Sequence, residues 1–174
     1  MADVSVRPAS LEDASEVARL QLATWRTAYG SIVPAHALDE LGEEQATAQW
    51  RAAVESPPTP RHHVLVALEQ QWLVGFAAFG PVPDDDLDAA TTGGIAALLV
   101  EPRWGRRGHG SRLLAATVDH LREDGFALAT VWLLARDTAS TTFYRSAGWE
   151  RDGAARVLDM AGSYVDEVRL HTAL

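Results

Sequence analysis

Apolar residues recur three and four positions apart in the N-terminal part of the chain, which is the spacing of one face of an α-helix. The residues on this face are Leu11, Ala14, Ala18, Leu22, Trp25 and Tyr29. Ser10 can cap the helix and Gly30 can end it, so the pattern predicts a first helix between these two residues. Two further helices are predicted, one from Pro34 toward Leu41 and one over residues 43–54.

Extended patterns fall mainly after residue 62. Alternating and continuous apolar runs predict strands over residues 4–7, 63–68, 72–79, 95–100, 127–134, 156–160 and 165–171. The continuous runs, 95–100 and 127–134, are typical of central strands buried on both faces. Helical spacing returns over 108–123 and 139–147. Because no repeat or linker interrupts this order, we expect one mixed α/β domain over residues 1–174.

Composition narrows the possible functions. The chain has 174 residues, a net charge of −9, and neither Lys nor Cys. The missing side chains exclude disulfides, Cys-ligated metal sites, thiol nucleophiles, Schiff bases and a Walker-type lysine. The acidic balance argues against a nucleic-acid partner. Neither a signal peptide nor an apolar stretch of about 20 residues is found, so we expect a soluble cytoplasmic protein without a membrane partner.

One segment, residues 100–114, suggests specific chemistry. A buried strand leads through an Arg- and Gly-rich turn into a helix, whose N-terminal N–H groups and dipole favour an anion. Gly108 and Gly110 let an anion approach the backbone, and four arginines lie nearby, Arg103, Arg106, Arg107 and Arg112. The segment predicts a phosphate or pyrophosphate site; the alternative is a plain connection with solvated arginines. It is not a dinucleotide fingerprint, because Leu113 occupies the third glycine position.

Two motifs in this part of the chain resemble a known family. The first runs from Val100-Glu-Pro-Arg-Trp104 into Arg107-Gly-His-Gly110, and the second is the segment from Asp137 to Trp149, with Phe143-Tyr144 and Gly148. In order and spacing they resemble the GNAT superfamily of acyl-CoA-dependent N-acetyltransferases, over a core of residues 95–149. The N-terminal half, with Trp25-Arg-Thr-Ala-Tyr29, is similar to one branch of it.

The resemblance implies a fold and a reaction. The fold would be a mixed, mostly antiparallel sheet with helices on both faces, whose central strands 95–100 and 127–134 splay apart to admit the cofactor. The reaction would be acetyl transfer from acetyl-CoA to a primary amine of a small molecule or peptide. The amine would attack the thioester directly in a ternary complex, with no metal.

The resemblance also implies residue roles. Cofactor-binding positions would be Leu98, Leu99, Val100, Arg106, Arg107, Gly108, His109, Gly110, Ser111, Asp137 and Tyr144. Tyr144 would also protonate the departing thiolate, although simple packing between helix and sheet is the other interpretation. Trp25 and Tyr29 would line the substrate groove; their spacing, like that of Trp50, equally suits the core.

Three departures from the family pattern bear on this prediction. Gly105 stands where the family has Arg or Gln, and Asp137 replaces an Asn that contacts the cofactor arm. The usual acidic base positions hold Gly94 and Trp132 instead. A water chain, a histidine such as His63, or an already neutral amine could take the place of that base, and the sequence identifies none of them.

Other polar residues have two interpretations each. Residues 84–88 are an acidic loop, either merely solvated or a gate that attracts a cationic amine. His109 would donate to a phosphate or face solvent. His62 and His63 lack partners with metal-ligand spacing, so no metal site is expected.

Two other functional classes stay open. The chain could be an acyl-CoA-binding sensor without turnover, which the missing base would favour. It could also be a structural domain with a vestigial site, and a homodimer is an option in either case.

Overall fold

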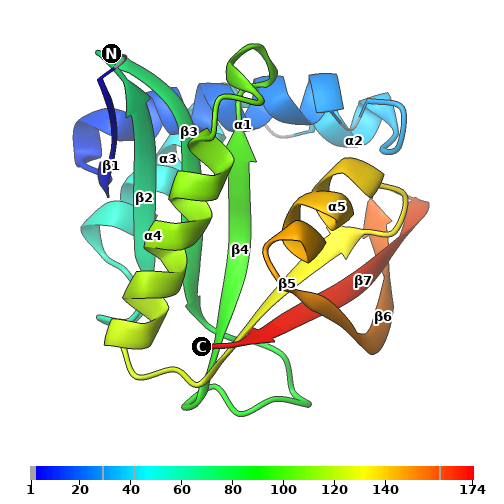
Figure 1. Ribbon diagram of the computed structural model, residues 1–174. Helices are drawn as coiled ribbons and strands as arrows, with labels where there is room; N and C mark the ends of the chain where they lie inside the picture. Colours follow the sequence, from blue (N-terminus) through cyan, green and yellow to red (C-terminus); the bar gives the residue numbers. More distant parts are fainter. Residues whose placement is uncertain (1–2, 29, 41, 161) are drawn as a thin grey trace.

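The strands expected from the apolar runs join in one sheet (Figure 1). The computed structural model describes residues 3–28, 30–40, 42–160 and 162–174. Its strands are β1 (Val4–Pro8), β2 (His63–Glu69), β3 (Trp72–Pro81), β4 (Thr92–Val100), β5 (Leu128–Leu134), β6 (Glu150–Met160) and β7 (Ser163–Ala173). Their order across the sheet is β1-β2-β3-β4-β5-β7-β6. The pair β4–β5 is parallel and the other neighbours are antiparallel, which confirms the mixed, mostly antiparallel sheet.

Helices cover both faces of this sheet, as expected. The helical segments are η1 (Leu11–Asp13), α1 (Ala14–Ala28), α2 (Ala35–Asp39), α3 (Glu43–Glu55), η2 (Pro102–Trp104), α4 (His109–Glu123) and α5 (Thr138–Ser146). α4 and α5 lie on one face, and α1, α2 and α3 lie on the other (Figure 1). Among the residues described, no helix is both long enough and apolar enough to span a bilayer.

The first helix starts differently from the expectation. Its first turn is the 3₁₀ segment η1, closed by a capping box in which Ser10 and Asp13 bind each other's backbone and side chain. Tyr29 and Leu41, expected near the ends of the first and second helices, lie outside the described residues.

Two strand starts were placed three or more residues too late in the sequence, and that of β7 two residues too late. β4 begins at Thr92, and this start was missed because Gly93 and Gly94 carry no strand signal. Packing requires Gly93, since a Cβ there would lie 2.5 Å from Leu121 Cδ2 of α4. β6 begins at Glu150 and contains a register shift between Arg151 and Ala155. It is an edge strand with mostly exposed residues, so its first half has no apolar alternation.

The central strands part along their length. β4 and β5 pair only from Thr92 with Leu128 to Ile95 with Val131. Beyond Ile95, β4 remains paired with β3, and beyond Val131, β5 remains paired with β7. The second half of β4 is therefore not paired with β5, which confirms the splayed strands (Figure 1).

Candidate active site

Three cavities follow one another along the divergence of β4 and β5. The first, called the helix-end cavity, lies at the N-terminus of α4 and has a volume of about 410 Å³. The second, the central cavity, has about 240 Å³ and is lined by both diverging strands. The third, the distal cavity, has about 550 Å³ and reaches α3 on the opposite face of the sheet.

Neighbouring cavities share part of their walls. The helix-end and central cavities share Leu98, Ser140 and Tyr144. The central and distal cavities share Ala96, Val131, Trp132 and Glu167. The three cavities therefore form a row that crosses the sheet from the side of α4 and α5 to the side of α1 and α3.

The structure brings most of the expected site residues to this row. The helix-end cavity is lined by Leu98, Val100, Arg106, Gly108, His109, Gly110, Ser111 and Tyr144. The central cavity is lined by Trp25, Leu98, Leu99, Asp137 and Tyr144. Arg107 lines neither of them.

The turn before α4 has the backbone geometry of an anion site. Gly108 caps the helix in the left-handed region, with φ +85°, and Arg106 also has a positive φ of +62°. The first N–H groups of an α-helix have no acceptor within the helix, and the helix dipole makes this end positive. Arg106 is exposed and has no carboxylate partner among the residues that the structure describes. Its guanidinium can therefore meet an anion bound at the helix end.

The other clustered arginines are engaged within the protein. Arg103 Nε is 2.9 Å from a carboxylate oxygen of Glu101, and Arg107 Nη1 is 3.0 Å from one of Glu69. Arg112 donates to the carbonyl oxygen of Arg107 and so braces the turn. All four arginines are exposed, and within the described residues Arg106 alone among them has no polar partner.

His109 behaves differently from the expectation. Its ring is buried, with 2% of the residue exposed, and Nε2 lies 2.7 Å from Glu69 Oε2. The expectation that its side chain faces solvent is therefore wrong, and Nε2 is engaged with Glu69. Since Glu69 also binds Arg107, this carboxylate ties the start of α4 to the end of β2. The buried ring could not be foreseen, because its partner is 40 residues away in the sequence.

Tyr144 occupies the wall between the helix-end and central cavities. It is buried, and its ring packs edge-on against Phe143 and Trp149, with centroid distances of 5.2 and 5.1 Å. These contacts hold the ring in place while the residue lines both cavities. Tyr144 thus both packs in the core and lines the two cavities.

Asp137 begins the helix that carries Tyr144. Oδ1 accepts a hydrogen bond from the Ser140 N–H at 3.0 Å, and Oδ2 accepts one from the Ser140 hydroxyl at 2.6 Å. Asp137 is thus an N-cap, a role in which carboxylate and amide side chains are both favourable. The Asp in place of the family's Asn is explained locally by this cap.

The distal cavity has mainly apolar walls with charged groups at one side. Its apolar wall includes Trp50, Pro58, Phe79, Pro81, Val82 and Ile95. Trp50 also packs on Phe76 at 5.0 Å and donates to Gln21, so it serves both core and cavity. Gly94, where the family has an acid, adds no side chain to this wall.

Two histidines line the distal cavity but are bound elsewhere. His62 Nδ1 is 2.8 Å from Thr59 Oγ1, and His63 Nε2 is 2.7 Å from Asp124 Oδ2. Neither lines the central cavity. Among the described residues, no group of three potential ligands is placed to hold a metal.

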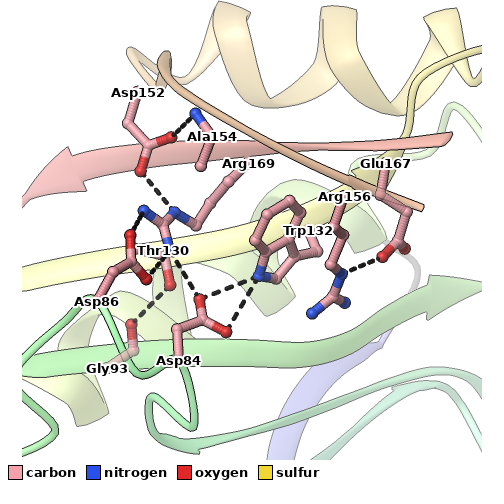
Figure 2. Close-up of polar contacts among 10 residues, drawn as sticks. All are labelled: Asp84, Asp86, Gly93, Thr130, Trp132, Asp152, Ala154, Arg156, Glu167 and Arg169. Atoms are coloured by element: carbon pink, nitrogen blue, oxygen red, sulfur yellow. Dashed lines mark hydrogen bonds and ion pairs between the residues drawn. The ribbon is translucent and has the colours of Figure 1, made fainter. Parts of the chain in front are cut away.

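A cluster around Arg169 fixes the acidic loop beside the distal cavity (Figure 2). Arg169 is 4% exposed and binds Asp84 at 3.0 Å, Asp86 at 2.6 Å and Asp152 at 2.5 Å. The hydrogen bond from Arg169 lowers the pKa of Asp86, and the hydrogen bond to Asp86 raises that of Arg169 above its usual range. The expectation of a merely solvated loop is therefore wrong for Asp84 and Asp86.

Trp132 connects this cluster to a second ion pair (Figure 2). Its Nε1 donates to Asp84 at 3.0 Å, and the guanidinium of Arg156 lies over its ring, 4.2 Å from a ring centroid. Arg156 Nε in turn donates to Glu167 Oε1 at 2.6 Å. Glu167 is only 8% exposed and was not identified from the sequence. One signal was available: Val165, Glu167 and Arg169 alternate along β7, which puts two charges at inward-facing positions.

Comparison with known proteins identifies relatives of this chain. The sequence model of the acetyltransferase (GNAT) family matches residues 20–149. A Bacillus subtilis protein described as the uncharacterized N-acetyltransferase YuaI is 30% identical over 168 residues, which is 96% of this chain and 91% of that protein.

Solved structures show the same fold. The PaiA N-acetyltransferase of Thermoplasma acidophilum in complex with coenzyme A has a TM-score of 0.74, with 15% identity and 99% of both chains covered. The putative acetyltransferase yncA of Salmonella typhimurium with acetyl-CoA has a TM-score of 0.73 and 19% identity, covering 98% of this chain and 93% of the other.

Proposed function

Since the chain belongs to the GNAT family of acetyltransferases, whose acetyl donor is acetyl-CoA, we propose that it acetylates a primary amine by direct attack on the thioester. One observation carries this proposal. A cavity at the N-terminus of α4 and a mainly apolar cavity lie on opposite faces of the sheet, and both adjoin a central cavity walled by Tyr144. Two substrates can thus approach one point from opposite sides.

The residues at the helix-end cavity fit the cofactor. The first N–H groups of α4 and the guanidinium of Arg106 would hold the pyrophosphate, and Gly108 keeps the turn in its left-handed conformation. The edge of β4 left unpaired by β5 would hold the pantetheine arm through backbone hydrogen bonds, over Leu98, Leu99 and Val100. The cofactor supplies an activated acyl group in its thioester.

The protein's own groups would supply orientation and a proton. The free backbone N–H groups of β4 would stabilise the negative charge that develops on the thioester oxygen. Tyr144, held by Phe143 and Trp149, would give its phenolic proton to the departing sulfur. No metal or acyl-enzyme is needed, since the amine attacks directly.

The distal cavity indicates the kind of amine. Its walls are mainly apolar, and its charged side has the carboxylates Asp84 and Glu167 beside Arg156. We propose an acceptor with an apolar body, such as an arylalkyl or branched alkyl amine, and no carboxylate. An amino acid would bring the negative charge of its own carboxylate toward these two carboxylates.

Thiol release from acetyl-CoA, measured with a panel of amines, tests the proposal. We expect Tyr144→Phe to lower kcat at least about tenfold, equivalent to about 1.4 kcal/mol, without changing acetyl-CoA affinity. Tyr164→Phe, at a tyrosine that is 74% exposed, is the matched control. Unchanged kcat in Tyr144→Phe would remove this residue from the mechanism. Acetyl-CoA binding without thiol release to any amine would instead favour a sensor without turnover.

A further inference from the structure

The central cavity, where the two substrates would meet, has few groups able to accept a proton. Among the described residues that line it, the ionisable side chains are Asp137, Tyr144 and Glu167. Both oxygens of Asp137 are engaged with Ser140 in the cap of α5. Tyr144 would give its proton to the departing sulfur and so does not accept one from the amine. Glu167 is therefore the remaining candidate.

Glu167 lies where the central cavity opens into the distal cavity, and it lines both. Its Oε1 accepts a hydrogen bond from Arg156 Nε at 2.6 Å (Figure 2). Its Oε2 has no donor within the part of the chain that the structure describes. One oxygen thus fixes the carboxylate, and the other is available to a ligand in the cavities.

The other groups of the distal cavity that could accept a proton, Asp84, His62 and His63, are less suited to accept one from the amine. Asp84 accepts hydrogen bonds from both Trp132 and Arg169, which occupy its oxygens. His62 and His63 do not reach the central cavity, and each has a ring nitrogen bound to another residue. Of the described residues that line these two cavities, only Glu167 has both a place at the junction and a carboxylate oxygen without a hydrogen-bond donor.

We propose that Glu167 is the general base of this protein, replacing the acid that is missing at Gly94 and Trp132. The inference rests on the proposed acetyl transfer and deepens it. An amine enters as an ammonium ion, and one N–H bond breaks as its proton passes to Glu167. The freed electron pair forms the C–N bond to the acetyl carbon.

The remaining steps balance without another reactant. The C–S bond breaks, and the sulfur leaves with the proton of Tyr144. The nitrogen loses its second proton, which restores the phenol through solvent. Glu167 releases its proton to solvent, so one proton appears in solution for each amide formed.

Glu167→Gln tests the assignment because it removes the basicity and preserves the shape. The matched control is Asp166→Asn, the neighbouring carboxylate on β7, which is exposed. Each variant is assayed with two acceptors of similar size. One is a strongly basic alkylamine, which is an ammonium ion at neutral pH, and the other is a weakly basic arylhydrazine, which is neutral there.

The alkylammonium ion must lose a proton before its nitrogen can attack, whereas the neutral hydrazine can attack without this step. We expect Glu167→Gln to lower kcat/KM about 100-fold for the alkylamine and less than about threefold for the hydrazine. Asp166→Asn should change neither value by more than about twofold. Equal losses with both acceptors, or no loss with either, would overturn the assignment.

A binding measurement separates this inference from the proposed function. Calorimetric titration of the alkylamine into the protein loaded with coenzyme A, which carries no acetyl group, should show weaker binding to Glu167→Gln. Acetyl-CoA affinity and Tm report whether Glu167→Gln folds. If it does not, Glu167→Asp, which withdraws the carboxylate by one methylene, is tested in its place, and kcat/KM should again fall more for the alkylamine than for the hydrazine. No turnover by the unsubstituted protein overturns the proposed function and this inference together, whereas undiminished turnover of the alkylamine by Glu167→Gln overturns only the inference.

Discussion

Replacing Arg169 with Gln should destabilise the protein strongly. The guanidinium is the common partner of Asp84, Asp86 and Asp152, and it uses Nη1, Nη2 and Nε to bind them. A glutamine amide is shorter, uncharged and has only two N–H donors. The substitution therefore leaves carboxylates without a cation in a largely buried cluster.

The expected magnitude follows from the exposure of those carboxylates. The side chains of Asp84 and Asp152 are 10% and 12% exposed, whereas that of Asp86 is 63% exposed and can rely on water. Removing one partner of a buried ion pair costs about 3–5 kcal/mol. Because both buried carboxylates retain some solvent contact, we expect a loss of about 3 kcal/mol in the free energy of unfolding. For a chain of this size, that corresponds to a fall of about 6–12 °C in Tm.

Urea unfolding followed by circular dichroism, together with calorimetry for Tm, measures this loss. The control is Arg151→Gln, an exposed arginine on β6, which should change the free energy of unfolding by no more than about 0.5 kcal/mol. A loss below about 1 kcal/mol for Arg169→Gln would refute the reasoning. It would mean that the three carboxylates separate and rehydrate without disturbing the fold.

Three smaller predictions follow from the same contacts. Arg169 lowers the pKa of Asp86 in the folded state, so the stability that this pair contributes is present at neutral pH. The difference in unfolding free energy between the unsubstituted protein and Asp86→Asn should be constant above about pH 5 and shrink as the pH falls below about 4. Glu69→Gln should weaken acetyl-CoA binding several-fold in calorimetry, because the buried His109 loses its carboxylate at the start of α4. Gly108→Ala should cost about 1–2 kcal/mol of stability and also weaken acetyl-CoA binding, because Ala is strained at φ +85°.

Each of these has a control or a contrary outcome. A difference in unfolding free energy between the unsubstituted protein and Asp86→Asn that persists at pH 2 would contradict the pairing of Asp86 with Arg169. Glu123→Gln, at the far end of α4, should leave acetyl-CoA affinity unchanged. If Glu69→Gln and Gly108→Ala also leave it unchanged, the turn before α4 is not the anion site.

Local patterns predicted the helices and strands well because burial on one face imposes a period. The apolar run 95–100 and the glycine turn at 108–110 correctly indicated a central strand that leads into a helix. The first half of β6 was missed because an edge strand exposed to water needs no apolar face. The start of β4 was missed because Gly93 is required by the side chain of Leu121, which is distant in sequence.

The site was predicted less completely, because its geometry depends on pairs of residues far apart in the chain. The resemblance predicted that Tyr144 and the N-terminus of α4 belong to the site, and in the structure both line the row of cavities. It did not predict Glu167, whose position follows from the pairing of β7 with β5 and β6. Similarly, the burial of His109 could not be predicted, because its partner Glu69 lies on β2, 40 residues away in the sequence.

The departure at Trp132 and the position of Glu167 have one physical explanation. Where the family has an acid on β5, this chain has an indole, which offers a flat face and a single N–H donor. The N–H binds Asp84, and the face carries Arg156, which binds Glu167. A tryptophan at this position thus removes one carboxylate from the junction and, through Arg156, orients another. The loss of the usual acid and the burial of a charge on β7 are then two consequences of the same arrangement.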